Sequence, residues 1–474
     1  MNPPVTIPCE GRIVYHLPEG QCIRSGRTLE SRGMSSYAEH VAAIQQRWEA
    51  ALTSNRFDAA VIAAGARQNY FLDDQAPPFR ANPHFAQWLD AGGCEHALLL
   101  VRPGHKPTLF FHQQRDYWHQ PPTPPDTADA IDVRVFDSLD ALVDGASRAL
   151  QSENRTALIG DWSTERTNLS VAEVNPQQLL SRLHYGRAYK TRFEIDCMRR
   201  ATEIGVQGHL AALAAYRVGA SEYDFHQAYL LASKQNETEL PYSNIVAQNE
   251  HAGVLHYQHY DREPPRQRAS FLIDAGGRYR GYASDITRTY AADEKSDFAA
   301  LVAALDARQQ ALIASIRPGL NYLALHESMH RAIGELLADF DLVRCSPAEA
   351  FESCITDAFI PHGLGHLLGL QTHDVAGHMV SPDGGTRPPP ERYSALRLTR
   401  DIGVDQIFTI EPGLYFIPML LDELRAKPAA KHVNWPVVGR FMQYGGIRIE
   451  DNVHVTSVGV VNLTRDAFAA AEAR

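Results

Sequence analysis

The stretch that decides the fold runs from Ser270 to Tyr290 and reads SFLIDAGGRYRGYASDITRTY. Two runs rich in β-branched and aromatic residues flank a glycine-rich turn, a pattern that predicts a β-hairpin. The hairpin would bring Asp274 and Asp285, eleven positions apart, to one point. Two unpaired carboxylates so close repel strongly, and a bound cation is the natural remedy. The spacing alone leaves a second interpretation open, in which both aspartates are surface residues beside a turn.

A second informative block lies between Ile360 and Asp374 and reads IPHGLGHLLGLQTHD. It holds three histidines, His362, His366 and His373, among three glycines. Glycines let the backbone pack close to a buried site and leave the imidazoles as its only large polar groups. The block is not a dinucleotide fingerprint, because no G-x-G-x-x-G follows a strand here. One such histidine would be typical of a satisfied core residue, but three in one block favour a functional site.

Two glutamates interrupt later runs of strand-forming residues. They are Glu411 in the run FTIEPGLY and Glu450 in the run GGIRIE. Pro412 favours an extended Glu411 and the end of a strand. Alternation places Arg448 and Glu450 on one face of the second run and its isoleucines on the other. For either glutamate alone, a solvent-facing position on an edge strand is the open alternative.

Asp274, Asp285, His366, Glu411 and Glu450 together offer four carboxylates and one imidazole. This oxygen-rich set favours Mn²⁺ or Co²⁺, with Zn²⁺ as an alternative, and differs from the thiolate sets of structural zinc sites. Two cations about 3.5–4 Å apart can bridge a water, lower its pKa towards neutrality and stabilise a tetrahedral intermediate. The pattern therefore indicates a two-metal hydrolase.

The composition excludes several classes of protein. The 474 residues are 44% hydrophobic and 21% charged, typical of a soluble globular protein long enough for two domains. No run approaches the roughly 18 apolar residues of a membrane span. The formal net charge of −11 argues against general affinity for nucleic acid or anionic membranes. The six cysteines form no C-x-x-C pair, so we expect neither a disulfide framework nor a zinc ribbon, and a cytoplasmic location.

The order of patterns predicts two domains after an extension. Residues 1–35 lack the apolar core of a signal peptide, and we interpret them as a mobile or weakly docked extension, with an unusual targeting leader as the alternative. Ser36 and Glu39 form a capping box that begins a helix. Short apolar runs between helical patterns then predict a small α/β domain over residues 36–185. Long helical patterns and strands over residues 186–474, which hold every candidate ligand, predict a catalytic domain.

Individual elements are predicted from the same patterns. The strands are expected over residues 59–63, 97–101, 108–111, 133–136 and 157–160. Helices are expected to begin between Tyr189 and Glu194, at Ser221, at Ser296 and at Tyr322.

Jointly the blocks, in this order and spacing, resemble the pita-bread metallopeptidases and, within them, the bacterial Xaa-Pro dipeptidases or prolidases. The resemblance runs from about Ser36 to the C-terminus. It also includes the segments YSNIVA, VLHY, LRLTR and HVNW, which begin at Tyr242, Val254, Leu396 and His432. It implies an α/β (α+β) protein with a small N-terminal α/β domain and a C-terminal pita-bread domain. It also implies hydrolysis of Xaa-Pro dipeptides, with release of the C-terminal proline.

The resemblance assigns roles around two divalent metal ions per subunit. The ligands would be Asp274, Asp285, His366, Glu411 and Glu450. Asp285 and Glu450 would bridge both ions, Asp274 would complete the shell of one, and the remaining two ligands would complete that of the other. A metal-bridging hydroxide would attack, and Glu411 would exchange its proton as general acid and base. His362 and Arg448 would support the ligands from outside the shell.

Other residues would handle the substrate. His373 would hydrogen-bond the scissile carbonyl as it gains negative charge. His256 and Arg397 would hold the C-terminal carboxylate, a task suited to a guanidinium fork. Tyr242 would form a pocket wall. Asp74 would reach into the site of a partner subunit, which implies a homodimer.

Three alternative functions remain open at this point. One is an Xaa-Pro aminopeptidase, which acts on longer peptides. Another is an organophosphorus acid anhydrolase activity in the same site. The third is a binding module that has lost its catalytic ligands, which the five ligands and the negative net charge disfavour.

Overall fold

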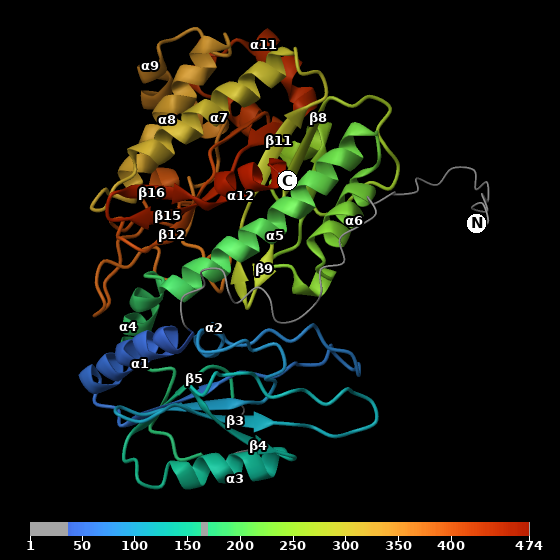
Figure 1. Ribbon diagram of the computed structural model, residues 1–474. Helices are drawn as coiled ribbons and strands as arrows, with labels where there is room; N and C mark the ends of the chain where they lie inside the picture. The colour runs from blue at the N-terminus through green and yellow to red at the C-terminus, as the bar shows by residue number, and fades with distance from the viewer. Residues whose placement is uncertain (1–36, 163–168, 474) are drawn as a thin grey trace, which may run out of the picture. The chain divides into compact units, whose positions relative to one another are not determined.

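The computed structural model describes residues 37–162 and 169–473 (Figure 1). The predicted extension over residues 1–35, and Ser36 of the predicted capping box, lie outside these described residues. Within the described ranges, no helix is long and apolar enough to cross a membrane. The described chain has an N-terminal region, residues 37–187, and a C-terminal region, residues 192–473, each built on its own sheets.

The N-terminal region contains one mixed six-stranded sheet in the order β4-β3-β2-β1-β5-β6. Its strands are β1 (Ala59–Ala63), β2 (Leu98–Val101), β3 (Thr108–His112), β4 (Asp132–Phe136), β5 (Thr156–Ile159) and β6 (Glu173–Val174). The apolar runs predicted as strands form β1 to β5, with ends that differ by no more than one residue. β1 pairs antiparallel with β2 and parallel with β5. All of its residues are buried, so the sheet needs cover on both faces.

Helices on both sides provide that cover. Three helices, α1 (Tyr37–Ser54), α2 (Pro83–Ala86) and α4 (Gln177–Arg187), pack Trp48, Phe85 and Leu179 on the face that includes Ile62. On the other face, α3 (Leu139–Ala149) packs Leu142 beside Val61. Figure 1 shows α3 across the sheet from α1. Successive side chains of β1 thus pack into the hydrophobic cores on opposite faces of the sheet, because side chains alternate along a strand.

The C-terminal region begins with two helices that have capping boxes. α5 (Arg192–Arg217) is capped by Thr191 with Glu194, and α6 (Glu222–Ser233) by Ser221 with Asp224. α7 (Asp297–Ser315) and α8 (Tyr322–Asp339) follow. The predicted starts of these helices are confirmed. The shorter helices are α9 (Pro347–Glu352), α10 (Pro418–Arg425), α11 (Trp435–Phe441) and α12 (Leu463–Glu472).

The strands of the C-terminal region form several small antiparallel sheets. One contains β7 (Ile245–Gln248), β8 (Ser270–Asp274) and β11 (Thr287–Ala291), with the hairpin β9 (Arg278–Tyr279) and β10 (Tyr282–Ala283) between the last two. Another contains β12 (Ile407–Ile410), β15 (Asp451–Thr456) and β16 (Gly459–Asn462). β13 (Gly413–Tyr415) pairs with β14 (Gly446–Arg448). An isolated bridge between Thr287 and Glu450 links β11 to the segment between β14 and β15.

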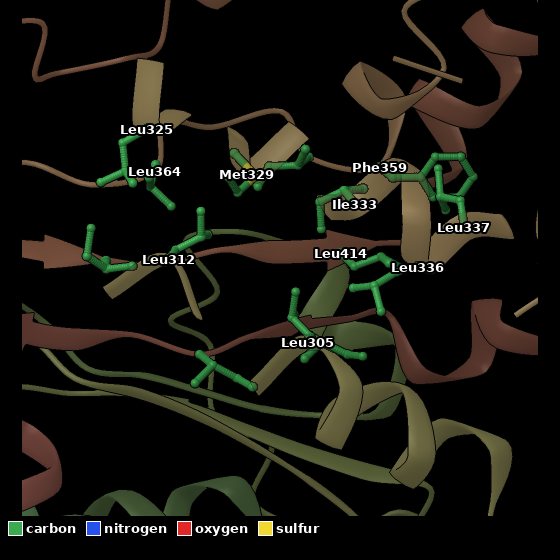
Figure 2. Packing of buried hydrophobic residues seen from close by; sticks show 14 of the residues in the cluster. Leu305, Leu312, Leu325, Met329, Ile333, Leu336, Leu337, Phe359, Leu364 and Leu414 are labelled. Atoms are coloured by element: carbon green, nitrogen blue, oxygen red, sulfur yellow. The ribbon is translucent and has the colours of Figure 1, made fainter. Parts of the chain in front are cut away.

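A hydrophobic core packs α7 and α8 against β12 and β13. Figure 2 shows Leu305 and Leu312 of α7, and Met329 and Ile333 of α8, in one packed group with Leu414 of β13. Full burial of a side chain of this size contributes roughly 1.5–3 kcal/mol. The core therefore fixes the position of the strands that flank Glu411.

Candidate metal centre

The hairpin predicted around Asp274 and Asp285 is present. β8 pairs with β11 in a register that places Asp274 opposite Thr287. Gly276 is required in the connection, because a Cβ there would lie 2.1 Å from the carbonyl oxygen of Ser284. Asp274 is 8% exposed and Asp285 is 5% exposed. The alternative of two surface carboxylates beside a turn is therefore wrong.

The two aspartates share a hydrogen-bond partner. The hydroxyl of Tyr242 lies 2.8 Å from Oδ1 of Asp274 and 2.5 Å from Oδ1 of Asp285. One hydroxyl proton can be donated to only one carboxylate at a time. Arg448 donates from Nη2 to Oδ2 of Asp274 at 2.7 Å. Tyr242, predicted as a pocket wall, therefore also contacts the candidate ligands.

The glycine-rich block places His366 between the acidic residues. A Cβ at Gly365 would lie 2.0 Å from the carbonyl oxygen of Thr409, so only glycine lets the block lie against β12. Nδ1 of His366 lies 3.1 Å from the carbonyl oxygen of Leu367. When Nδ1 donates there, Nε2 keeps its lone pair for a metal. Nε2 lies 3.3 Å from Oδ2 of Asp285, 3.8 Å from Oε1 of Glu411 and 4.0 Å from Oε1 of Glu450.

The two glutamates are held at the ends of strands. Glu411 follows β12 directly, and Pro412 separates it from β13 as the sequence predicts. Glu450 is 2% exposed, and its Oε2 accepts a hydrogen bond from Thr287 Oγ1 at 2.8 Å. The Glu411 side chain is 17% exposed, and Glu411 lines a cavity. The solvent-facing alternative is therefore wrong for Glu450, and the exposure of Glu411 is limited.

The electrostatics of the cluster favour a bound cation. Burial, and then Asp274, raise the pKa of Asp285 well above its ordinary value. Burial and then Glu450 raise the pKa of Glu411 well above its ordinary value. Burial and then Asp285 raise the pKa of Glu450 in the same way. Burial lowers the pKa of His366, which favours the neutral ring that metals bind. Ligand atoms of Asp285, His366 and Glu450 all lie within 4.8 Å of one another. This crowded set of oxygen donors with one nitrogen fits divalent metal ions.

A cavity of about 1190 Å³ gives access to the cluster. Its lining includes every candidate ligand and most other predicted site residues, namely Asp274, Asp285, His366, Glu411, Glu450, Tyr242, His256, His362, His373, Arg397 and Arg448. Arg80, Asn82 and His84 of the N-terminal region also line it. Asp74, which was predicted to serve a partner's site, is exposed on the loop before α2 and is not among the described residues of the lining.

His362 and His373 both contact the surroundings of the cluster. Nε2 of His362 lies 2.8 Å from the hydroxyl of Tyr415, and its Nδ1 lies 3.7 Å from Oε2 of Glu411. The rings of His373 and His366 are 4.4 Å apart and nearly perpendicular. Burial lowers the pKa of His362 to about 4. Burial, followed by His366, lowers that of His373 to about 3. Both rings are therefore neutral near pH 7.

The sequence did not identify Thr287 and Tyr415 as parts of this site. Besides Glu450, Oγ1 of Thr287 contacts Nε of Arg448 at 3.3 Å. The hydroxyl of Tyr415 links Arg448 Nη1, at 2.9 Å, to His362. Strand alternation from Asp285 to Thr287 was a usable signal for the threonine. Tyr415 was not identified, and its contacts with Arg448 and His362 form only in the folded chain.

Comparison with known families agrees with this arrangement. Residues 196–457 match Metallopeptidase family M24, and residues 35–185 match the family described as Xaa-Pro dipeptidase, N-terminal domain. The fold and the carboxylate-rich site therefore define a metallopeptidase of family M24. Membership of this family implies bound divalent metal ions.

Curated relatives cover nearly the whole chain. The Xaa-Pro dipeptidase of Actinobacillus pleuropneumoniae serotype 5b is 42% identical over 433 residues, which are 91% of this chain and 97% of the relative. That of Pseudoalteromonas haloplanktis is 43% identical over 435 residues, which are 91% of this chain and 98% of the relative. The chain belongs to the Xaa-Pro dipeptidases of family M24, and the predicted family is confirmed.

Solved structures share the fold. Aminopeptidase P from E. coli with the inhibitor Pro-Leu superposes with a TM-score of 0.68 at 23% identity, covering 93% of this chain and 100% of that one. Aminopeptidase PepP from Pseudomonas aeruginosa gives the same TM-score, identity and coverage. At this identity the likeness shows the fold alone. The predicted class, an N-terminal α/β domain followed by a pita-bread domain, is confirmed.

Proposed function

We propose that this chain hydrolyses Xaa-Pro dipeptides at a centre of two divalent cations and releases proline. The observation that carries the proposal is the buried cluster of Asp285, Glu411 and Glu450 around Nε2 of His366, open to a cavity. Cations held there would supply a bridging hydroxide and positive charge for the developing oxyanion. The similarity to curated Xaa-Pro dipeptidases supports dipeptides as the substrates.

The positions of the side chains support one allocation of ligands. Asp274 would hold one cation, Asp285 and Glu450 would hold both, and His366 and Glu411 would hold the other. The hydroxyl of Tyr242 lies within hydrogen-bond distance of both aspartates, which supports a shared position for Asp274 and Asp285. The excess of oxygen donors supports Mn²⁺, with Co²⁺ or Zn²⁺ as alternatives.

The surrounding residues would move protons and stabilise charge. Glu411 would exchange the proton of the attacking water, since a carboxylate in the cluster is placed for general acid and base chemistry. His373 is neutral and faces the cavity, so one ring nitrogen can donate to the scissile carbonyl oxygen. His362 and Arg448, joined through Tyr415, would keep the ligands in position.

His256 and Arg397 would recognise the free C-terminal carboxylate of the substrate. Both are exposed residues that line the cavity. Burial lowers the pKa of His373, and Arg397 and His256 lower it further, which supports their position near the cluster. A guanidinium with an imidazole makes a suitable carboxylate clamp. A third residue after proline would collide with it, which would restrict the enzyme to dipeptides.

We also propose a homodimer. The loop that carries Asp74 has an apolar tip, where Phe71 and Leu72 are each 91% exposed. Exposed apolar side chains of this size are typical of a surface that another chain covers. Asp74 would then contact the site of the second subunit.

The domain limits and the location are proposals as well. The limits are an extension over residues 1–35, an N-terminal domain over residues 36–185 and a catalytic domain over residues 186–474, and the family match to residues 35–185 supports the second. The cysteines Cys94, Cys197, Cys345 and Cys354 are free thiols, which supports a reducing cytoplasm.

One comparison of substrates tests the proposed function. With Mn²⁺ or Co²⁺, the purified protein should release proline from Ala-Pro and leave Ala-Pro-Ala largely intact. Equal kcat/KM for the two would instead support the aminopeptidase. Arg397→Ala should chiefly lower dipeptide turnover, and no change would remove Arg397 from the clamp. Organophosphorus triester hydrolysis, if present, needs no carboxylate clamp and should survive that substitution.

A further inference from the structure

Glu222 is a buried carboxylate outside the metal centre that the proposed reaction does not use. It is the first residue of α6 and is 1% exposed. Oε1 accepts from the backbone nitrogen of Gln248 at 2.7 Å and from Nδ1 of His251 at 2.9 Å. Oε2 accepts from the hydroxyl of Tyr257 and from the backbone nitrogen of Asp261, both at 2.8 Å. Each oxygen thus has two donors.

The two oxygens bind opposite ends of one loop, residues 249–260. Gln248 is the last residue of β7, and His251 lies in the 3₁₀-helix Asn249–Gly253, so Oε1 holds the entry to the loop. Tyr257 and Asp261 lie on its return, so Oε2 holds the exit. The rings of His251 and Tyr257 also stack, with centroids 4.5 Å apart. The Glu222 carboxylate therefore holds the two ends of the loop together.

His256 stands at the part of this loop that faces the cavity. It is exposed, and it makes no hydrogen bond within the described part of the chain. The backbone bonds nearest to it run from Val254 N to His251 O and from Tyr257 N to Val254 O, at 3.0 and 3.1 Å. They make a local turn but do not tie that turn to β7. Glu222 ties this turn to α6 through Tyr257, the residue directly after His256. Further along the loop, Gln258 and Tyr260 donate to the carbonyl oxygens of Ser243 and Asn244.

Glu222, His251 and Asp261 also have ligand atoms close enough to be considered for a metal ion. The hydrogen bonds argue against this use. Four donors occupy the carboxylate, which has about four lone-pair positions. A charged carboxylate that accepts this many hydrogen bonds is a structural anchor, and breaking it leaves buried donors without partners.

We propose that Glu222 is a positioning residue for substrate recognition: its carboxylate fixes the loop 249–260 so that His256 meets the C-terminal carboxylate of the dipeptide. This inference rests on the proposed function, in which His256 binds that carboxylate. It follows that loss of the Glu222 hydrogen bonds weakens the preference for substrates with a free C-terminal carboxylate more than it weakens hydrolysis itself.

The test compares two substrates with the same scissile bond, Ala-Pro and Ala-Pro-amide, in the Mn²⁺-loaded enzyme. Glu222→Gln keeps the shape but replaces one acceptor oxygen with an amide donor, so either orientation leaves a backbone N–H unsatisfied. The ratio of kcat/KM for Ala-Pro over the amide should fall on the order of tenfold, the equivalent of one charge-assisted hydrogen bond. The kcat/KM for the amide should stay within about twofold.

A milder variant covers the case in which Glu222→Gln does not fold. Tyr257→Phe removes one donor to Oε2 and keeps the ring that stacks on His251. Tyr257→Phe should lower the same kcat/KM ratio by a few fold, which corresponds to the free energy of about one neutral hydrogen bond. The matched control is Glu194→Gln, another buried carboxylate in the first turn of a helix, 2% exposed and bonded to Tyr282, with no contact to the loop among the described residues. It should reduce stability without changing the ratio.

The outcomes separate this inference from the proposed function. If His256→Ala removes the preference for Ala-Pro but Glu222→Gln and Tyr257→Phe do not, the proposed function stands and the positioning role is overturned. An equal fall for both substrates would show a purely structural role and also overturn it. If wild-type enzyme does not distinguish the two substrates, the carboxylate clamp fails, and the role of Glu222 fails with it.

Discussion

Two regions of this molecule bury carboxylates in opposite ways. Near the join of α4 and α5, Asp374 lies 2.5 Å from Nη2 of Arg187 and 2.8 Å from Nζ of Lys190, and all three side chains are almost fully buried. Although burial opposes ionisation, these two cations hold the pKa of Asp374 below its ordinary value. In the candidate metal centre, burial and then Asp274 raise the pKa of Asp285, and burial and then Asp285 raise the pKa of Glu450.

The difference lies in the source of the positive charge. The structural carboxylate is neutralised by cations that belong to the chain. The candidate centre gathers four carboxylates, and one of them, Asp274, pairs with Arg448. Its remaining negative charge is expensive in a buried position unless ions from solution balance it. The contrast thus separates a carboxylate that the chain neutralises itself from carboxylates that we propose as metal ligands.

The largest effect is expected from Asp285→Asn. The substitution removes the proposed bridging ligand, so kcat/KM for Ala-Pro should fall at least about 10³-fold and bound metal should fall with it. Activity assays and elemental analysis of the purified protein would measure both. The metal-free variant should be no less stable than metal-free wild type, since a repelling charge is gone. Full activity would contradict the two-metal assignment.

Asp374→Asn should chiefly lower the stability of the protein, in contrast to Asp285→Asn, which should chiefly lower activity and bound metal. It leaves Arg187 and Lys190 buried without their counter-ion, which should lower the free energy of unfolding by about 3–5 kcal/mol. Urea denaturation would measure the change. Asp383→Asn is a matched control, because Asp383 pairs with Arg182 but its side chain is 68% exposed, and it should change stability little. An Asp374→Asn protein as stable as wild type would contradict the structural role that the comparison assigns to Asp374.

The same carboxylate predicts a pH dependence. Because the folded-state pKa of Asp374 is lowered, its contribution to stability is present above the ordinary carboxyl pKa. The contribution is lost as the pH falls through the lowered folded-state value. Wild-type protein should therefore lose stability more steeply on acidification than Asp374→Asn. Parallel acid limbs of the two stability curves would show that Asp374 is not a charged anchor.

Arg448→Lys should have an intermediate effect on the metal centre. A lysine cannot reproduce the contacts of the guanidinium with Asp274, Tyr415 and Thr287 at once. Loss of such a supporting contact typically costs about 10–100-fold in metal affinity or activity. Titration of the metal-free protein with Mn²⁺ would measure it. Unchanged affinity and turnover would mean that Arg448 serves packing alone.

Thr287→Val should give the smallest effect. It keeps the shape but removes the hydrogen bond to Glu450, worth about 0.5–1.5 kcal/mol, so Mn²⁺ affinity should fall by roughly two- to tenfold. Thr289→Val is the control, because in the described part of the chain the Thr289 hydroxyl bonds the backbone of Arg448 and no carboxylate. A larger loss of metal affinity in the control than in Thr287→Val would reverse the roles of the two threonines.

Much of the secondary structure could be predicted because its signals are local. Apolar runs gave β1 to β5, and the capping residues Thr191 and Ser221 mark the starts of α5 and α6. The family could also be recognised, because its motifs are short and ordered along the chain. The ligand roles, the metal identity, the dimer and the cytoplasmic location remain predictions.

The sequence by itself determined which residues were available: four carboxylates, one histidine among glycines, and the hairpin that joins Asp274 to Asp285. Only the tertiary structure decided that these carboxylates come together in one cluster, and that Tyr415 and Thr287 hydrogen-bond the residues within and around it. The physical reason is the distance along the chain over which each interaction acts. Propensity, capping and strand alternation act over a few residues, whereas burial and hydrogen bonds between side chains more than 150 positions apart, as between Thr287 and Glu450, exist only after distant segments have packed.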